Sequence, residues 1–423
     1  MSDLSPVPAA VAQHCNFLPD PKPNRAIEVN RRSFLLAATS LLLHQLLVAC
    51  GGQTQATLKV RLLKSSIPAQ LLDAFEKQTS RDLNLDFSAI AQLEEIYSQL
   101  RQWHQPVPPN RKKGLNLPFF GDRSLKNNIP DLVTLGDYWL SQAIREGLIR
   151  PLDASDLQGW SALPPQWQQL VKRNDRGELD PNGSIWAVPY RWGTTAIAYR
   201  ADKFKTLGWT PTDWSDLWNP QLRDRLSLLD QPREIIGLTL KKLGHSYNTQ
   251  SLKTVASLRD ELQTLHAAVK FYSSDTYLQP LILGDTWIAV GWSTDIVPLT
   301  KRNRQIKAII PASGTALWAD LWVRPADSAP VEASNALALS PQVKQWLEFC
   351  WQPEIARKLS ILSDAASPRL STPEMFDPVL LENGDRTVQL PSPELFQKSE
   401  FLTPLPSQSL QEYLNLWQEI RRS

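Results

Sequence analysis

Thr-Leu-Lys-Val-Arg-Leu-Leu, residues 57–63, alternates apolar and polar side chains, as a half-buried β-strand does. Pro68 then marks the start of a helix on which Leu71 and Phe75 share an apolar face. The alternation continues, with strands expected at 83–87 and 130–135 and helices at 92–103 and 138–146. This order is typical of α/β proteins with a doubly wound, parallel sheet.

The second half of the chain repeats this style without repeating the sequence. Its patterns predict strands at 194–200, 226–230, 287–292, 307–311 and 317–323, and helices at 234–243, 252–266, 341–349 and 409–421. A proline-rich, irregular stretch at 105–129 interrupts the first half, and we interpret it as an insertion loop. The full length of 423 residues is enough for roughly two or three domains.

The composition excludes several classes of protein. Hydrophobic residues make up 42% and charged residues 21% of the chain, which fits a folded protein. The formal net charge of +2 gives no electrostatic basis for binding nucleic acid. The 3 Cys and 5 His show no zinc-ligand spacing, so we expect neither a metal nor a cofactor. The common motifs of nucleotide-dependent, hydrolytic and metal-dependent enzymes are missing, which favours binding over catalysis.

Residues 1–49 have the order of an export signal: Arg31-Arg32, a short apolar run, and Leu-Val-Ala-Cys ending at Cys50. The last four residues resemble the lipobox of bacterial lipoproteins, in which the Cys becomes the lipid-carrying first residue. The arginine pair resembles a twin-arginine export signal. We therefore expect a lipid anchor on Cys50. Cys350, in a helical pattern, is expected to be a small buried apolar residue.

A ligand site is predicted beyond the carboxyl ends of the strands, where open α/β sheets bind their ligands. Among the carboxylates and tryptophans that fall in such places are Asp137, Glu234, Trp292, Trp318 and Asp320, and the same loops also carry Asp230 and Asp295. Aromatic faces attract an ammonium group, and carboxylates accept charge-assisted hydrogen bonds from it. The combination suits an organic cation.

Each of these residues also has a purely structural interpretation. Asp137 is suited to cap a helix, and Glu234 to complement a helix dipole. The two tryptophans are suited to a core. Asp320 is different, because it lies within an apolar strand where an unpaired carboxylate is costly.

Three stretches resemble the spermidine/putrescine-binding proteins that serve bacterial ABC importers. They are Ala-Val-Pro-Tyr-Arg-Trp-Gly-Thr-Thr-Ala-Ile at 187–197, the capped turn at 213–220, and residues 228–249. The resemblance extends from about 57 to 423, outside the insertion. It implies that Glu234, Trp292, Trp318 and Asp320 line one cleft, and that Gln231 stands where the family has an Asp.

The resemblance also implies a two-lobed periplasmic-binding-protein fold of type II, each lobe being a doubly wound sheet flanked by helices. Lobe one is expected to span 57–195 and 319–370, and lobe two 196–318 and 371–423. The implied function is capture of a small cationic, polyamine-like solute between closing lobes, and its delivery to an ABC transporter permease. The implied location is the periplasm, with the Cys50 lipid holding the protein at the membrane.

Departures from the family leave alternatives open. The loop after the first strand carries Lys64 where the family has Trp, Glu and Tyr, and Asp137 replaces a small hydroxyl residue. A zwitterionic or anionic solute on the same scaffold is one alternative, with Lys64, Arg191 and Arg233 as counter-charges. An enzyme on the same fold is another, although it would need an acid/base pair or nucleophile that the sequence does not show.

Overall fold

Strands β1 (Ala56–Leu63), β2 (Leu83–Ile90) and β3 (Leu132–Gly136) form the parallel sheet predicted for the first half of the chain. The alternation in β1 buries Leu58, Val60 and Leu62 on one face. The computed structural model describes residues 56–80, 83–104, 129–155, 157–328, 337–370 and 388–422. The export signal with Cys50 and most of the 105–129 insertion lie outside these ranges.

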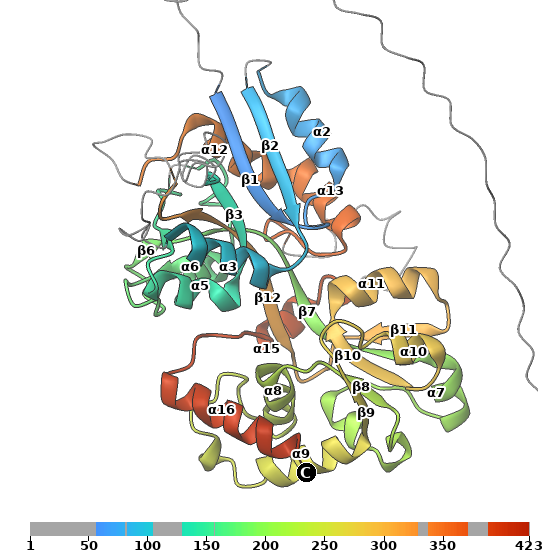
Figure 1. Ribbon diagram of the computed structural model, residues 1–423. Helices are drawn as coiled ribbons and strands as arrows, with labels where there is room; N and C mark the ends of the chain where they lie inside the picture. The colour runs from blue at the N-terminus through green and yellow to red at the C-terminus, as the bar shows by residue number, and fades with distance from the viewer. Residues whose placement is uncertain are drawn as a thin grey trace, which may run out of the picture. The chain divides into compact units, whose positions relative to one another are not determined.

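Helices cover this sheet, and Figure 1 shows α2, α12 and α13 together beside β1 and β2. Phe75 of α2 packs edge-on against Trp346 of α12, with 4.9 Å between the ring centroids. The helices of this half are α2 (Ala69–Gln78), α3 (Leu93–His104), α5 (Asp137–Arg145), α6 (Pro165–Val171), α12 (Pro341–Trp351) and α13 (Pro353–Ser363). Its short strands are β4 (Ile149–Arg150), β5 (Lys172–Arg173) and β6 (Ser184–Ile185).

Two long strands, β7 (Val188–Arg200) and β12 (Ala316–Pro325), join the halves of the molecule (Figure 1). They pair antiparallel to each other, and β12 is also antiparallel to β3. The sheet order is β2-β1-β3-β12-β7-β10-β8-β9. The parallel pairing expected from the strand–helix alternation holds for β1, β2 and β3, and the central strands are antiparallel because the chain passes from one half to the other on β7 and returns on β12.

The second half adds parallel strands β8 (Leu226–Leu228), β9 (Val269–Tyr272) and β10 (Ile288–Trp292), with β11 (Ile306–Ile309) paired antiparallel to β7. Its α-helices are α7 (Ala201–Leu207), α8 (Pro232–Lys242), α9 (Leu258–Ala268), α10 (Gln279–Leu283), α11 (Ser293–Arg302), α15 (Pro393–Lys398) and α16 (Ser407–Ile420). Short 3-10 turns occupy Trp214–Trp218, Pro220–Leu222 and Leu252–Thr254, and β13 is Glu400–Phe401. The capped turn predicted near residue 213 is confirmed, since the Asp213 carboxylate accepts a hydrogen bond from the Trp214 backbone.

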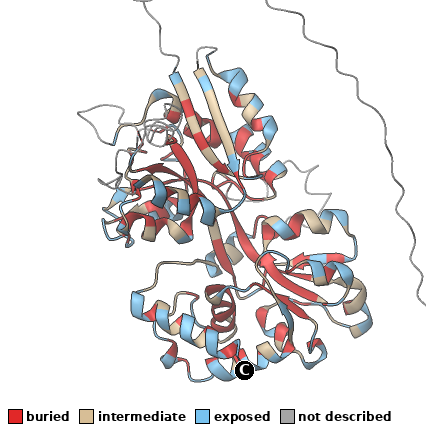
Figure 2. Cartoon of the chain, viewed as in Figure 1, coloured by how far each residue is buried: buried red, intermediate tan, exposed pale blue. Residues whose placement is uncertain are grey.

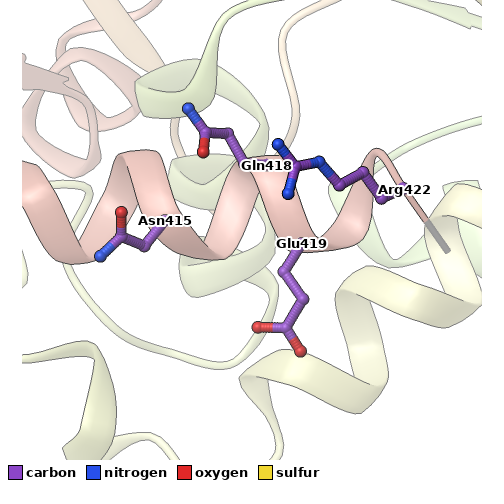
Figure 3. Close-up of a pocket in the computed structure, with 4 residues that line it drawn as sticks. All are labelled: Asn415, Gln418, Glu419 and Arg422. Atoms are coloured by element: carbon purple, nitrogen blue, oxygen red, sulfur yellow. The ribbon is translucent and has the colours of Figure 1, made fainter.

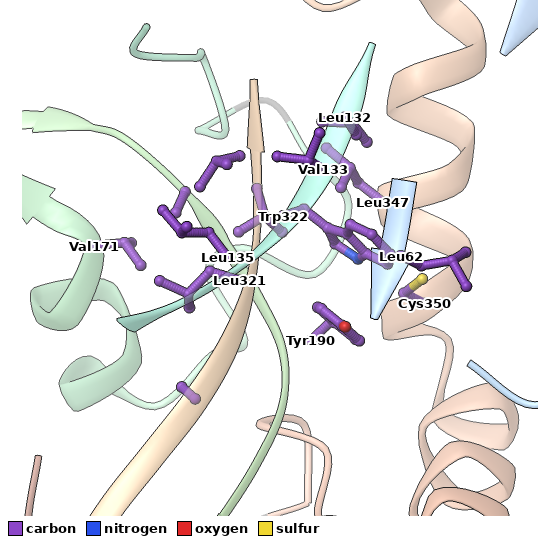
Figure 4. Packing of buried hydrophobic residues seen from close by; sticks show 14 of the residues in the cluster. Leu62, Leu132, Val133, Leu135, Val171, Tyr190, Leu321, Trp322, Leu347 and Cys350 are labelled. Atoms are coloured by element: carbon purple, nitrogen blue, oxygen red, sulfur yellow. The ribbon is translucent and has the colours of Figure 1, made fainter. Parts of the chain in front are cut away.

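The buried apolar residues form two cores, which Figure 2 shows as red segments in each half. Figure 4 shows part of the first core, where Leu62, Trp322 and Leu347 surround Cys350. Cys350 is buried and its thiol is free, as expected, and burial raises its pKa well above the ordinary value. The lobe boundaries drawn from the sequence stay a prediction, because a core marks where side chains cluster and not where a chain hinges.

Candidate functional site

Three predicted residues, Trp292, Trp318 and Asp320, lie on one face of the central strands. The register sets Arg191 opposite Asp320, Gly193 opposite Trp318, and Thr195 opposite Trp292. Alternate residues of a strand, and residues directly opposite in an antiparallel pair, project to the same side. We call these six residues the candidate face.

Gly193 makes room for the Trp318 ring on this face. A β-carbon at Gly193 would lie 2.3 Å from Cζ2 of Trp318 and 2.5 Å from Oγ of Ser293. Both distances are far shorter than a carbon contact allows, so a side chain at Gly193 would displace the ring. The Ser293 hydroxyl also accepts a hydrogen bond from the Thr194 backbone at 3.1 Å, which ties α11 to β7.

Asp320 is not a vacant carboxylate. Nε of Arg191 donates to its Oδ2 at 2.5 Å, and the side chains of the two residues are 7% and 3% exposed. Such burial of two charges is tolerated because each neutralises the other. Asp295, in the first turn of α11, also attracts Arg191, and its Oδ2 accepts a hydrogen bond from the Tyr277 hydroxyl at 2.8 Å.

Glu234 lies in the first turn of α8 and reaches the candidate face through Thr195. The Thr195 hydroxyl donates to Oε2 of Glu234 at 3.0 Å, and Glu234 is buried. Burial raises the pKa of Glu234 to about 7, and Thr195, Arg233 and Trp292 partly oppose this effect. A buried carboxylate without a resident cation bonded to it is suited to accept one from a ligand.

Trp292 is held in place by Tyr277. The Tyr277 hydroxyl accepts a hydrogen bond from the Trp292 backbone at 3.0 Å, and the two rings meet edge-on. Trp292 keeps part of its surface exposed, so its ring is available to a ligand.

Asp137 begins α5 and is buried against β12. Its Oδ1 accepts a hydrogen bond from the Ala319 backbone at 2.9 Å, next to Trp318 and Asp320. Burial raises the pKa of Asp137 to about 7, opposed by the Ala319 bond and by the charge of Arg173. Asp137 therefore ties α5 to the strand that carries the candidate face.

The remaining predicted residues stand apart. Gln231 is exposed at the N-cap of α8, and within the described residues no side-chain hydrogen bond joins it to the candidate face. Lys64 is exposed after β1. Arg233 is buried, but its two terminal nitrogens donate to the Thr403 carbonyl and to Oδ1 of Asn248, at 3.0 and 2.9 Å.

Two side-chain interactions of the candidate face were not predicted from the sequence: the Arg191–Asp320 ion pair and the Thr195–Glu234 hydrogen bond. From the sequence, Arg191 is expected only as a counter-charge for an anionic solute, whereas in the structure it pairs with Asp320. The hydrogen bond between Thr195 and Glu234 is not expected from the sequence. The signal was present in the stretch 187–197, where the two-residue period of a strand places 191, 193 and 195 on one side.

A surface hollow of about 440 Å³ lies on α16, lined by Asn415, Gln418, Glu419 and Arg422 (Figure 3). All four side chains are exposed, and Glu419 is paired with Arg259. The hollow brings together neither a buried carboxylate nor an aromatic ring. We therefore place the site on the candidate face, where buried charge and aromatic surface coincide.

The two cores joined by β7 and β12, with a charged and aromatic face on the joining strands, define a two-lobed binding protein of type II. A spermidine/putrescine transporter substrate-binding protein of Streptococcus pneumoniae has this fold, with a TM-score of 0.69. That structure is 20% identical to this protein, and the match covers 87% of this chain and 99% of the other.

A family model for bacterial extracellular solute-binding proteins matches residues 127–385, and the chain belongs to this family. The spermidine/putrescine-binding periplasmic protein of Escherichia coli K12 is 26% identical over 335 residues, or 79% of this chain and 83% of that relative. The putrescine-binding periplasmic protein of the same organism is 29% identical over 245 residues, or 54% and 62% of the two chains. The predicted family and the prediction of a binding protein rather than an enzyme are confirmed.

Proposed function

We propose that this protein is the solute-binding component of an ABC importer and captures a small aliphatic amine. The observation that carries the proposal is the buried Glu234 carboxylate, bonded to Thr195 and adjacent to Trp292. A carboxylate beside aromatic rings recognises an ammonium group by charge and its methylenes by ring surface. The names of the relatives support an amine, since spermidine and putrescine are both polyamines.

The proposed mode of capture is closure of the two halves about β7 and β12. A ligand bound between the halves would contact Glu234 of the second half. It would also contact Trp318 or Asp320 on the joining strand β12. Binding energy gained in the closed form alone shifts the population towards it. The closed form is then delivered to a membrane permease. Asp137 and Gln231 complete the proposed set of ligand residues.

Replacement of Glu234 by glutamine tests the proposal. We expect the variant to bind spermidine and putrescine roughly ten- to a hundredfold more weakly, because it loses a charge-assisted hydrogen bond of about 1.5–3 kcal/mol. Isothermal calorimetry measures the change. Glu94→Gln, an exposed change on α3, is the matched control and should leave the affinity unaltered. Equal affinities for the wild type and Glu234→Gln would contradict the proposed site.

We also propose that the protein is exported to the periplasm, by either the general secretory or the twin-arginine route, and anchored by a lipid on Cys50. The order of arginine pair, apolar run and Leu-Val-Ala-Cys supports this. Within the described residues no helix is long and apolar enough to cross a membrane.

Cys50→Ser is expected to move the protein from the membrane fraction to the soluble fraction, or to leave its precursor uncleaved. Cell fractionation with N-terminal sequencing measures both outcomes, and Cys350→Ser is the control. Native protein that is soluble and still begins at Met1 would overturn the anchor.

A further inference from the structure

Only one of the three guanidinium nitrogens of Arg191 donates a hydrogen bond to a protein acceptor among the described residues. Its Nε is bonded to Asp320, and its side chain is 7% exposed. Within the described residues, its two terminal nitrogens, Nη1 and Nη2, donate to no protein acceptor. Neither of these nitrogens is among the buried, unpaired side-chain atoms of the described residues, so both are open to an acceptor from outside the chain.

A further unpaired donor lies beside Arg191. Cζ of Arg191 is 5.8 Å from the centre of the Trp318 ring, and Nε1 of Trp318 is buried without a hydrogen-bond partner in the described part of the chain. Carboxylate oxygens match a group of N–H donors of this kind, whereas an ammonium group, which has no acceptor, does not.

Arg233 is a second buried arginine, and it differs from Arg191 in how its terminal nitrogens are used. Both of its terminal nitrogens are bonded to groups of the protein, so it has none left for a ligand. Of these two arginines, Arg191 is the one whose terminal nitrogens remain available to a ligand, whereas the unpaired nitrogen of Arg233 among the described residues is its buried Nε.

The candidate face has opposite character at its two ends. Arg191 and Trp318 present donors at one end, and Glu234, bonded to Thr195, presents an acceptor at the other. Arg191 and Thr195 are four positions apart along β7, which corresponds to about 13 Å between their α-carbons. The ring of Trp318 lies between these ends, over Gly193.

We propose that Arg191 binds a carboxylate of the ligand, so that the solute is an aliphatic amino acid with an amine and a carboxylate at opposite ends. This inference rests on the proposed function, in which Glu234 takes the amine. Arg191 already supplies the cation that neutralises Asp320, so a second amine of a diamine would find that carboxylate occupied. A terminal carboxylate would instead complete the unused donors of Arg191.

The test compares ligands of matched length. Putrescine, 4-aminobutanoate and succinate share a four-carbon chain and differ in their end groups, and the five- and six-carbon series repeat the comparison. Calorimetry on the wild-type protein should give the tightest binding for an amino acid in at least one series. Tighter binding of the diamine in every series would overturn the inference and leave the amine-binding function intact. Binding of no amine, or tightest binding of a diacid, would overturn the proposed function and this inference with it.

Two variants examine the role of Arg191 itself. Arg191→Lys keeps the charge beside Asp320 and loses the forked donors, so it should weaken amino-acid binding roughly ten- to a hundredfold. The double variant Arg191→Met/Asp320→Leu removes the ion pair as a unit and should give a similar loss. Unchanged amino-acid affinity in either folded variant would overturn the inference.

Discussion

Replacement of Asp320 by alanine is expected to lower the free energy of unfolding by about 3–5 kcal/mol, because it leaves the Arg191 guanidinium buried without its counter-ion. The pair is the most buried of the salt bridges that join described residues, with side chains 7% and 3% exposed. Urea unfolding of the purified protein, followed by tryptophan fluorescence, measures the loss as a lower midpoint at an unchanged slope.

The control for this prediction is Asp86→Ala. Asp86 pairs with Arg61 at 3.3 Å, and its side chain is 40% exposed, so its loss should cost at most about 1 kcal/mol. Arg191→Met/Asp320→Leu should recover part of the stability lost by Asp320→Ala, since no unpaired charge remains. A loss for Asp320→Ala no larger than for Asp86→Ala would show that the buried pair is not needed.

The ligand-free protein is expected to lose stability as the pH rises from 5 to 8. Burial raises the pKa of Asp137 from 3.8 and that of Glu234 from 4.5, each to about 7. The folded state therefore holds these protons more tightly than the unfolded state. Their contribution is fully present below the ordinary pKa values and is lost as the pH rises through about 7. The steepest loss is about 1.4 kcal/mol per pH unit for each group.

The difference between the wild type and Asp137→Asn/Glu234→Gln isolates these two groups from other titrating residues. Over pH 5 to 8, the wild type should lose about 1–3 kcal/mol more per group than the double variant. Thermal melts in a series of buffers measure the difference. Parallel curves for the two proteins would show that neither carboxylate titrates in this range. A cationic ligand should bind more tightly as the pH rises, because it favours the ionised Glu234.

Much of the fold could be predicted because its signals are local. The alternation of 57–63 predicted β1, and the buried face of Leu58, Val60 and Leu62 follows directly from it. The pairing of β7 with β12 could not be predicted in this way, because it joins residues more than a hundred positions apart. Local periodicity carries no information about such a partner or its direction.

For the candidate site too, the residues could be predicted from local signals, but their long-range contacts could not. Trp292, Trp318 and Asp320 could be named from their places on strands, and the cost of a lone carboxylate in an apolar strand already required a partner for Asp320. Glu234 could be named from its place after a strand. That its carboxylate meets Thr195 depends on how α8 packs against β7, which no spacing in the sequence encodes.

Hydrophobic period and residue chemistry are properties of short segments, so the class of the protein, its strands and helices, and the residue types available to a ligand can be predicted from the amino-acid sequence alone. Which charged side chains pair with one another depends on the tertiary structure. The register of β7 and β12 sets Arg191 against Asp320, so one carboxylate is neutralised within the protein, while among the described residues no cationic side chain is bonded to Glu234. Electrostatic energies depend on distances of a few ångströms and on burial, and both exist only once distant segments have packed together.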